Sequence, residues 1–175
     1  MTLHPGDVLL YRPTGIFGWV IATKTWHQVG HCEIYLGAGV SVASRDGLGV
    51  GIYPLRTADL ATVCREAPRT CAYGGETHTF PLRFDLAKAL AWYRIQPAQP
   101  YGWLDLLQFV GLNIDSKGIV CSPFATEFLR AGGLDPFNHE PSLKIAPFQF
   151  RLSPVFDVTE VPNGVELDAV VVAPA

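Results

Sequence analysis

A short glycine-containing turn between two apolar segments is the feature that most constrains the fold. Residues 31–36 read HCEIYL, residues 37–39 read GAG, and residues 40–44 read VSVAS. Segments rich in β-branched and aromatic residues favour strands, and a tight glycine turn between two of them favours an antiparallel hairpin. The sequence therefore predicts a strand over 31–36 that returns as a strand over 40–44.

Other segments extend this hairpin into a larger sheet. Residues 8–11 read VLLY after a Gly-Asp turn, and residues 47–54 read GLGVGIYP. Both are predicted to be extended, and the valine-rich residues 165–172 are predicted to form a final strand. Residues 14–29 fit either a helical turn or a loop. Residues 55–79 are predicted to be a mostly irregular connection, because they contain proline and a Gly-Gly pair.

Helices are predicted in the second half of the chain. Apolar residues recur at helical spacing over 84–95, over 101–111 and over 121–131, and Gly-Gly at 132–133 ends the third segment. We find no internal repeat and no linker. The chain is therefore expected to form a single α+β domain over residues 1–175, in which an antiparallel sheet packs against helices.

Composition excludes several classes of protein. Apolar residues make up 49% of the 175 residues and charged residues only 17%, whereas a typical globular chain carries about 25% charged residues. Disorder needs the opposite balance. The net charge of −3 predicts no nucleic-acid partner. No apolar run approaches the roughly 18 residues of a membrane span, so no stable membrane insertion is expected. Oligomeric state is not indicated.

The cysteines and the N-terminus bear on compartment. Residues 1–7 contain no basic patch before an apolar stretch, so we expect no signal peptide and a chain that is cytoplasmic as synthesised; another system would have to deliver it to a cell wall. Cys32, Cys64, Cys71 and Cys121 form no CxxC pair and no cluster at zinc spacing, so no metal or other cofactor is expected. They fit free thiols, although Cys64 and Cys71 are also spaced to bridge a loop.

Cys121 is the first candidate for chemistry. It directly precedes Ser122-Pro123, and proline favours the first turn of a helix because its missing N–H is not needed there. Cys121 is thus predicted to lie at a helix N-terminus. The positive end of the helix dipole stabilises a thiolate, so a thiol placed there is a candidate nucleophile. The alternative is a buried cysteine at the start of an ordinary core helix.

His31 is the second candidate, because it opens the first strand of the hairpin. A strand gives its side chains a fixed direction, so His31 could hold an imidazole rigidly beside a thiol. A strand-end histidine bonded to backbone is the alternative. Taken together, a rigid histidine and a cysteine at a helix start are the two components of a Cys–His nucleophilic pair.

Four short segments of the sequence, in their order along the chain, resemble segments of the circularly permuted papain-like hydrolases. This group includes the YiiX-like relatives of NlpC-type cell-wall peptidases and the lecithin–retinol acyltransferases. Residues 31–37 are similar to its H-x-x-I-Y-x-G strand, and residues 6–9 (GDVL) to the segment before it. Residues 121–124 (CSPF) resemble the start of its nucleophile helix, and residues 145–156 its Pro-rich tail. In the permuted order the histidine precedes the cysteine, which follows here after 90 residues.

The resemblance implies a papain-like fold and a mechanism. Cys121 would attack a carbonyl as a thiolate, and His31 would remove its proton and later protonate the leaving group. The backbone N–H of Cys121 would help to stabilise the oxyanion. Tyr101, which precedes the helix ahead of the nucleophile, would add a hydroxyl there; packing of its ring against the helices is an equally good interpretation.

The sequence departs from the family at the third catalytic position. With a turn centred near Ala38, the cross-strand partner of His31 falls near residue 43 or beyond, and Ala43 has no side chain that could orient an imidazole. Glu33 lies on the same strand face as His31 and is the preferred substitute. Ser44 and Asp46 would serve if the register slips. The charge pair of residues 45–46 is otherwise more typical of a solvated turn than of a substrate clamp.

Three functions are consistent with these residues. The first is a hydrolase of amide bonds, with peptidoglycan peptides as the first substrate to test. The second is a lipid acyl hydrolase or acyltransferase that uses the same pair, with an acyl groove lined by Trp19, Trp26, Trp92 and Trp103. The third is a non-catalytic binding or structural module, as in a phage particle, which Ala43 would favour.

Overall fold

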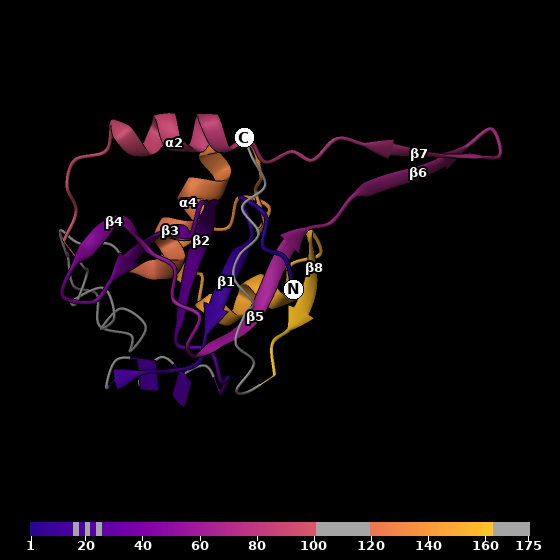
Figure 1. The fold of residues 1–175 in the computed structure, drawn as a ribbon. Helices are drawn as coiled ribbons and strands as arrows, with labels where there is room; N and C mark the ends of the chain where they lie inside the picture. The colour runs from indigo at the N-terminus through magenta and orange to yellow at the C-terminus, as the bar shows by residue number, and fades with distance from the viewer. Residues whose placement is uncertain (16–17, 20–21, 24–25, 101–119, 163–175) are drawn as a thin grey trace.

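An antiparallel sheet of six strands forms the centre of the molecule. The computed structural model describes residues 1–175 except 16–17, 20–21, 24–25, 101–119 and 163–175. The sheet has the order β4-β3-β2-β1-β5-β8, and β6 and β7 form a separate two-stranded sheet that projects from the body (Figure 1). The strands are β1 (Val8–Tyr11), β2 (His31–Gly37), β3 (Val40–Arg45), β4 (Gly49–Pro54), β5 (Leu60–Glu66), β6 (Arg69–Tyr73), β7 (Glu76–Phe80) and β8 (Phe156–Glu160).

Helices pack on one face of this sheet. Helix α4 (Cys121–Ala131) contacts β2 and β3, and α2 (Leu86–Arg94) packs against α4 (Figure 1). Two short 3₁₀ turns, η1 (Ser142–Lys144) and η2 (Pro147–Leu152), follow α4. The α+β class predicted from the sequence is thus confirmed. No helix in the described part of the chain has both the length and the apolarity needed to cross a bilayer.

Strand β1 is buried on both faces, which accounts for its continuous apolar sequence. Val8 and Leu10 belong to the larger core under α4, together with Phe124 and Phe128 of that helix. Leu9 and Tyr11 point to the opposite face and belong to a second apolar cluster. A strand covered on both sides loses the apolar–polar alternation of a half-exposed strand and reads as a continuous apolar run.

The strands predicted over 8–11, 31–36, 40–44 and 47–54 and the helices predicted over 84–95 and 121–131 are present, with bounds within two residues of those expected. The strand over 8–11 and the helix over 121–131 begin and end where predicted, and the hairpin strands each extend by one residue. The helix predicted over 84–95 is α2, which starts later, because Asp85 is its N-cap and accepts a hydrogen bond from Lys88 N. The helix predicted over 101–111 and the strand over 165–172 lie outside the described residues.

The prediction of a mostly irregular connection over 55–79 is wrong. That stretch contains β5 and β6 and most of β7. Strand β5 is buried at six of its seven positions between β1 and β8, so its side chains show little alternation. The Gly74-Gly75 pair is the turn of the β6–β7 hairpin, with φ of +65° and +83°, which only glycine adopts readily. Strand β8, which completes the sheet edge, was not predicted.

The Phe84 ring anchors the chain just before α2. It packs so closely between Gly6 and Gly132 that a Cβ on Gly6 would lie 2.6 Å from the ring, and one on Gly132 2.5 Å from it. Gly132 is the C-cap of α4, and its carbonyl accepts a hydrogen bond from Asp85 N at 2.8 Å. The ring therefore holds the start of α2 against the end of α4 and against the segment before β1.

We expect Gly132→Ala to lower the free energy of unfolding by about 1–3 kcal/mol, because the added methyl group overpacks a ring that Gly6 blocks on its other side. Urea unfolding measures the loss. In a Phe84→Leu background the same substitution should cost at least about 1 kcal/mol less. An equal cost in both backgrounds would contradict the proposed clash.

Candidate active site

Cys121 is the first residue of α4, as the sequence predicts. Its predecessor Val120 is the N-cap and has extended backbone angles, with no side-chain hydrogen bond to the helix. The N–H groups of the first helical turn have no intrahelical partner and point along the axis toward the helix start. The thiol is buried. The sulfur is thus in a dry environment at the positive end of a helix.

The Cys121 thiol contacts two adjacent residues of β2. It forms hydrogen bonds with the side chain and the backbone of Cys32 and with the ring of His31. The hydrogen bond from the Cys32 side chain is the strongest influence on the pKa of Cys121, ahead of burial, which acts in the opposite direction. The positive charge of His31 and its hydrogen bond add to the effect. Together these contacts hold the pKa of Cys121 well below that of an ordinary thiol.

His31 lies between Cys121 and Glu33. Its Nε2 is 3.1 Å from Glu33 Oε1, which leaves Nδ1 as the ring nitrogen for the thiol. Burial alone would lower the pKa of His31. The negative charge of Cys121, its hydrogen bond, and the contact with Glu33 outweigh burial and raise the pKa to about 9. The lowered pKa of Cys121 and the raised pKa of His31 both favour a thiolate beside an imidazolium.

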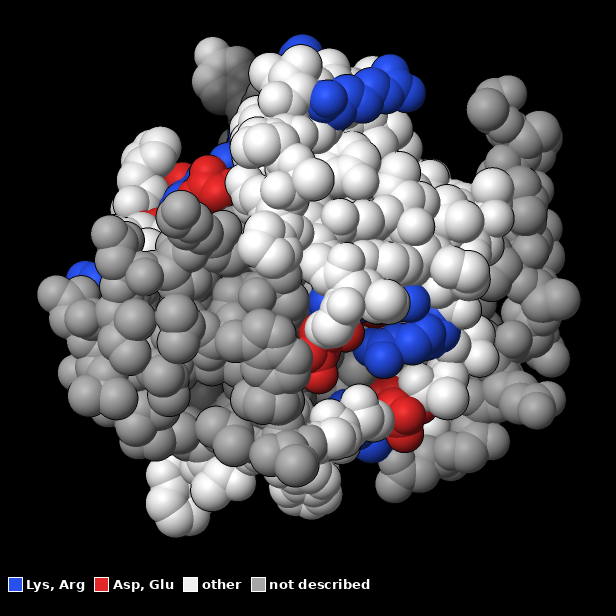
Figure 2. Space-filling model, turned by 90° about the vertical axis from the view of Figure 1, so that its left-hand side faces the viewer, with Lys and Arg blue, Asp and Glu red and all other residues white. Residues whose placement is uncertain are grey.

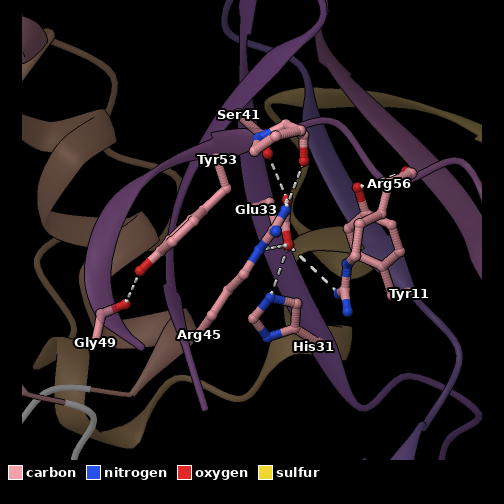
Figure 3. Close-up of polar contacts among 9 residues, drawn as sticks. Tyr11, His31, Glu33, Ser41, Arg45, Gly49, Tyr53 and Arg56 are labelled. Atoms are coloured by element: carbon pink, nitrogen blue, oxygen red, sulfur yellow. Dashed lines mark hydrogen bonds and ion pairs between the residues drawn. The ribbon is translucent and has the colours of Figure 1, made fainter. Parts of the chain in front are cut away.

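Glu33 is fully buried and has four cationic or polar partners (Figure 3). Arg45 forms a two-point ion pair, with Nε to Oε1 and Nη2 to Oε2, both at 2.9 Å. Ser41 Oγ donates to Oε2, and Arg56 Nη2 lies 3.3 Å from Oε1. Burial opposes ionisation, but the hydrogen bonds from His31, Arg45 and Ser41 and the charge of His31 lower the pKa of Glu33 to about 2.

This arrangement gives each group a defined state at neutral pH. Glu33 remains ionised and accepts the Nε2 proton of His31, which fixes the ring orientation. His31 holds a proton that it can transfer to a leaving group, and Cys121 provides a nucleophile with its charge already formed. The geometry can therefore support nucleophilic attack by sulfur followed by proton transfer.

The structure brings together three of the four predicted site residues, namely Cys121, His31 and Glu33. Tyr101 lies outside the described residues. Of the two alternatives to Glu33, Ser44 is buried within β3 and Asp46 is exposed in the following turn. Glu33 is the carboxylate that contacts His31 Nε2.

Sequence reasoning missed the residues that hold Glu33. The interpretation of residues 45–46 as a solvated turn is wrong for Arg45, whose side chain is only 14% exposed and binds Glu33. Ile34 pairs with Val42, and this register, continued along the strands, puts Arg45 rather than Ala43 opposite His31. Counting an equal number of residues on each side of Ala38 pairs His31 with Arg45, so the sequence could have indicated this contact. No signal in the sequence indicates Arg56, which follows β4.

The other cysteines differ from Cys121. Burial is the largest cause that raises the pKa of Cys64, to about 12, and burial also raises the pKa of Cys32. Cys71 is exposed on β6, and all four cysteines are free thiols, so Cys64 and Cys71 form no bridge in this structure. Within the described ranges, no three His, Cys, Asp or Glu side chains converge to hold a metal ion.

Comparison with known proteins adds no assignment. The sequence matches no protein-family model, and no similar curated protein is found.

Iodoacetamide should alkylate Cys121 at pH values well below the ordinary thiol pKa of about 8.5, because its thiolate is already formed there. His31→Ala should move the onset of labelling to higher pH, since the imidazolium is one of the groups that lower the pKa of Cys121. Mass spectrometry of peptides follows each cysteine, and exposed Cys71 serves as the reference within the same molecule. A midpoint of the pH dependence of labelling for Cys121 that is no lower than that for Cys71, or that does not respond to His31→Ala, would contradict this assignment.

Proposed function

We propose that this protein is a thiol hydrolase that cleaves an amide bond through an acyl-enzyme on Cys121. The observation that carries the proposal is the hydrogen-bonded series Cys121–His31–Glu33, with the cysteine at a helix start. The three side chains come from two elements that pack directly on each other, β2 and α4. Their relative positions are thereby fixed by the core rather than by a loop.

The first half of the reaction forms a thioester. The Cys121 thiolate attacks the carbonyl carbon, and negative charge develops on the carbonyl oxygen. The backbone N–H of Cys121 at the free start of α4 is the donor best placed to stabilise that charge. His31 then gives its proton to the departing nitrogen, so that the amine leaves neutral and the imidazole becomes neutral.

The second half returns the enzyme to its resting state. Neutral His31 takes a proton from water, and the resulting hydroxide attacks the thioester carbon. The carboxylic product leaves, and Cys121 is again a thiolate beside an imidazolium. Glu33 remains an anion throughout and keeps the ring oriented, since its pKa of about 2 prevents protonation near neutral pH.

The fold that we propose is papain-like with a permuted chain order. Support comes from the antiparallel sheet with its nucleophile helix on one face, and from the histidine strand β2 preceding α4 along the chain. The third position differs from the family pattern. Glu33, on the same strand as His31, takes the place of a residue from the neighbouring strand, and that neighbour instead supplies Arg45 to hold Glu33. In this proposal Ala43 does not need to orient His31, because Glu33 does so.

Peptidoglycan stem peptides are the amide substrate that we propose first, on the basis of the family resemblance. Figure 2 shows one face of the molecule, on which the charged side chains of the described residues are few and basic groups lie next to acidic ones.

One observation favours a second candidate substrate, an acyl ester. Trp19 and Trp26 are 62% and 92% exposed and line a cavity of about 520 Å³ together with Pro13, Ala22 and His27. This cavity adjoins the segment that leads into His31. Trp92, in contrast, packs on Phe124 and Phe128 in the core, and Trp103 lies outside the described residues. Arg12 and Asp59 also line this cavity, but most of its lining surface is apolar, and such a cavity with exposed tryptophans suits an acyl chain better than a peptide.

Cys121→Ala and His31→Ala should each reduce hydrolysis of the preferred substrate by about 10³-fold or more, and Glu33→Gln by about 10²-fold. In Glu33→Gln the alkaline limb of the pH profile, near pH 9 in the wild type, should move to lower pH, because His31 loses a group that raises its pKa. The assay compares release of amines from peptidoglycan fragments with hydrolysis of nitrophenyl acyl esters.

Two matched controls accompany this assay. His139 is an exposed turn residue and Asp46 an exposed carboxylate near the site, so His139→Ala and Asp46→Asn should retain wild-type rates. Trapping of an acyl group on Cys121, seen as an added mass on the intact protein, would identify the intermediate. Folded wild-type protein that hydrolyses neither substrate class, and forms no adduct, would support the non-catalytic alternative instead.

A further inference from the structure

The β6–β7 hairpin is an arm that the rest of the described chain does not cover. All ten residues of its two strands are exposed, and Figure 1 shows it extending away from the main sheet and the helices. Among the strands of the described residues, its two strands pair only with each other. An isolated two-stranded hairpin is only marginally stable in water, and a third strand is usually needed.

The base of the arm is nevertheless firmly held. Buried Glu66, the last residue of β5, accepts hydrogen bonds from Arg83 N at 2.7 Å and from Phe84 N at 3.0 Å. Ala67 N donates to Val155 O at 2.8 Å. The two segments that lead into and out of the arm are thus hydrogen-bonded to each other where they meet the body. This base presents the arm outward in a defined direction.

The turn determines which backbone groups lie on the free edges of the arm. Positive φ at both Gly74 and Gly75 is the signature of a type I′ turn, in which Tyr73 and Glu76 form a hydrogen-bonded pair. Antiparallel pairs alternate between hydrogen-bonded and non-hydrogen-bonded. On β6, Thr70 and Ala72 therefore direct their N–H and C=O groups outward, to the free edge.

We propose that this edge of β6 pairs with the same edge of a second copy of the chain. The two β6 strands would run antiparallel about a two-fold axis through Cys71, in a four-stranded sheet of order β7-β6-β6-β7. Thr70 of one copy then forms the hydrogen-bonded pair with Ala72 of the other, because both direct backbone groups outward. Such an interface is isologous and closes at two copies. This inference is independent of the proposed catalytic function.

Side-chain complementarity favours β6 over β7 for this contact. The two-fold register puts Arg69 opposite Tyr73 of the second copy, and a guanidinium on an aromatic ring is attractive. Arg69 already lies 5.5 Å from the centroid of the Phe80 ring on the same face. The equivalent pairing of two β7 strands would put the Glu76 carboxylate against Phe80 and two His78 rings against each other. Neither of those contacts is favourable.

Sedimentation equilibrium on the full chain tests the interface. We expect a species of twice the 19.1 kDa chain mass, with a concentration-dependent equilibrium. Ala72→Pro should raise the dimer dissociation constant at least about tenfold, because proline removes an outward N–H without touching the bonds between β6 and β7. Thr77→Pro removes the corresponding N–H from the β7 edge and is the matched control, which should leave the dimer unchanged.

Cys71 provides a second readout. In the proposed register the two Cys71 residues form a non-hydrogen-bonded pair, with Cα atoms about 4.5 Å apart, which is within reach of a disulfide. Mild copper–phenanthroline oxidation should therefore link two chains through Cys71. In a Cys71→Ser background, His78→Cys should not link them. A chain that remains monomeric, a dimer insensitive to Ala72→Pro, or a dimer lost in Thr77→Pro would overturn the proposal.

Discussion

The buried carboxylate of Glu33 is the constraint on which the site depends. An isolated charge in a protein interior costs several kcal/mol, and only close partners with good geometry offset that cost. Arg45, Arg56, Ser41 and His31 provide those partners. Because they come from β2, β3 and the segment after β4, the carboxylate can remain ionised only when this half of the sheet is correctly assembled. Folding and the charge state of the site are thereby linked.

The electrostatic influence of this carboxylate reaches the sulfur through the His31 ring. Glu33 fixes His31 and favours its protonated form, and protonated His31 favours the thiolate of Cys121. The apolar composition of the chain serves this arrangement, since core residues on both faces of β1 exclude water around the few charged groups. In the described part of the chain the three buried carboxylates, Asp7, Glu33 and Glu66, are each paired with arginine.

Local patterns predicted the elements that position the site. The Gly37–Gly39 turn gave the β2–β3 hairpin, Pro123 gave the start of α4, and the period of 2 along β2 put Glu33 beside His31. Tertiary relations could not be predicted in this way. The contact of Cys32 with Cys121 depends on how α4 packs on β2, and the approach of Arg56 depends on the path after β4. Strand β5 lies between β1 and β8, which are distant from it in sequence, and is buried on both faces. Its sequence therefore lacks the alternation of apolar and polar residues by which a strand is predicted.

The protonation state of His31 is the most direct test of the account. In protein labelled with ¹⁵N-histidine, NMR should show the His31 ring protonated on both nitrogens at pH 7, and it should lose a proton only near pH 9. Cys121→Ala should lower that pKa, because the negative charge of Cys121 is the strongest influence that raises it. A neutral His31 ring at pH 7 in the wild type, or a pKa unchanged by Cys121→Ala, would contradict the thiolate–imidazolium pair.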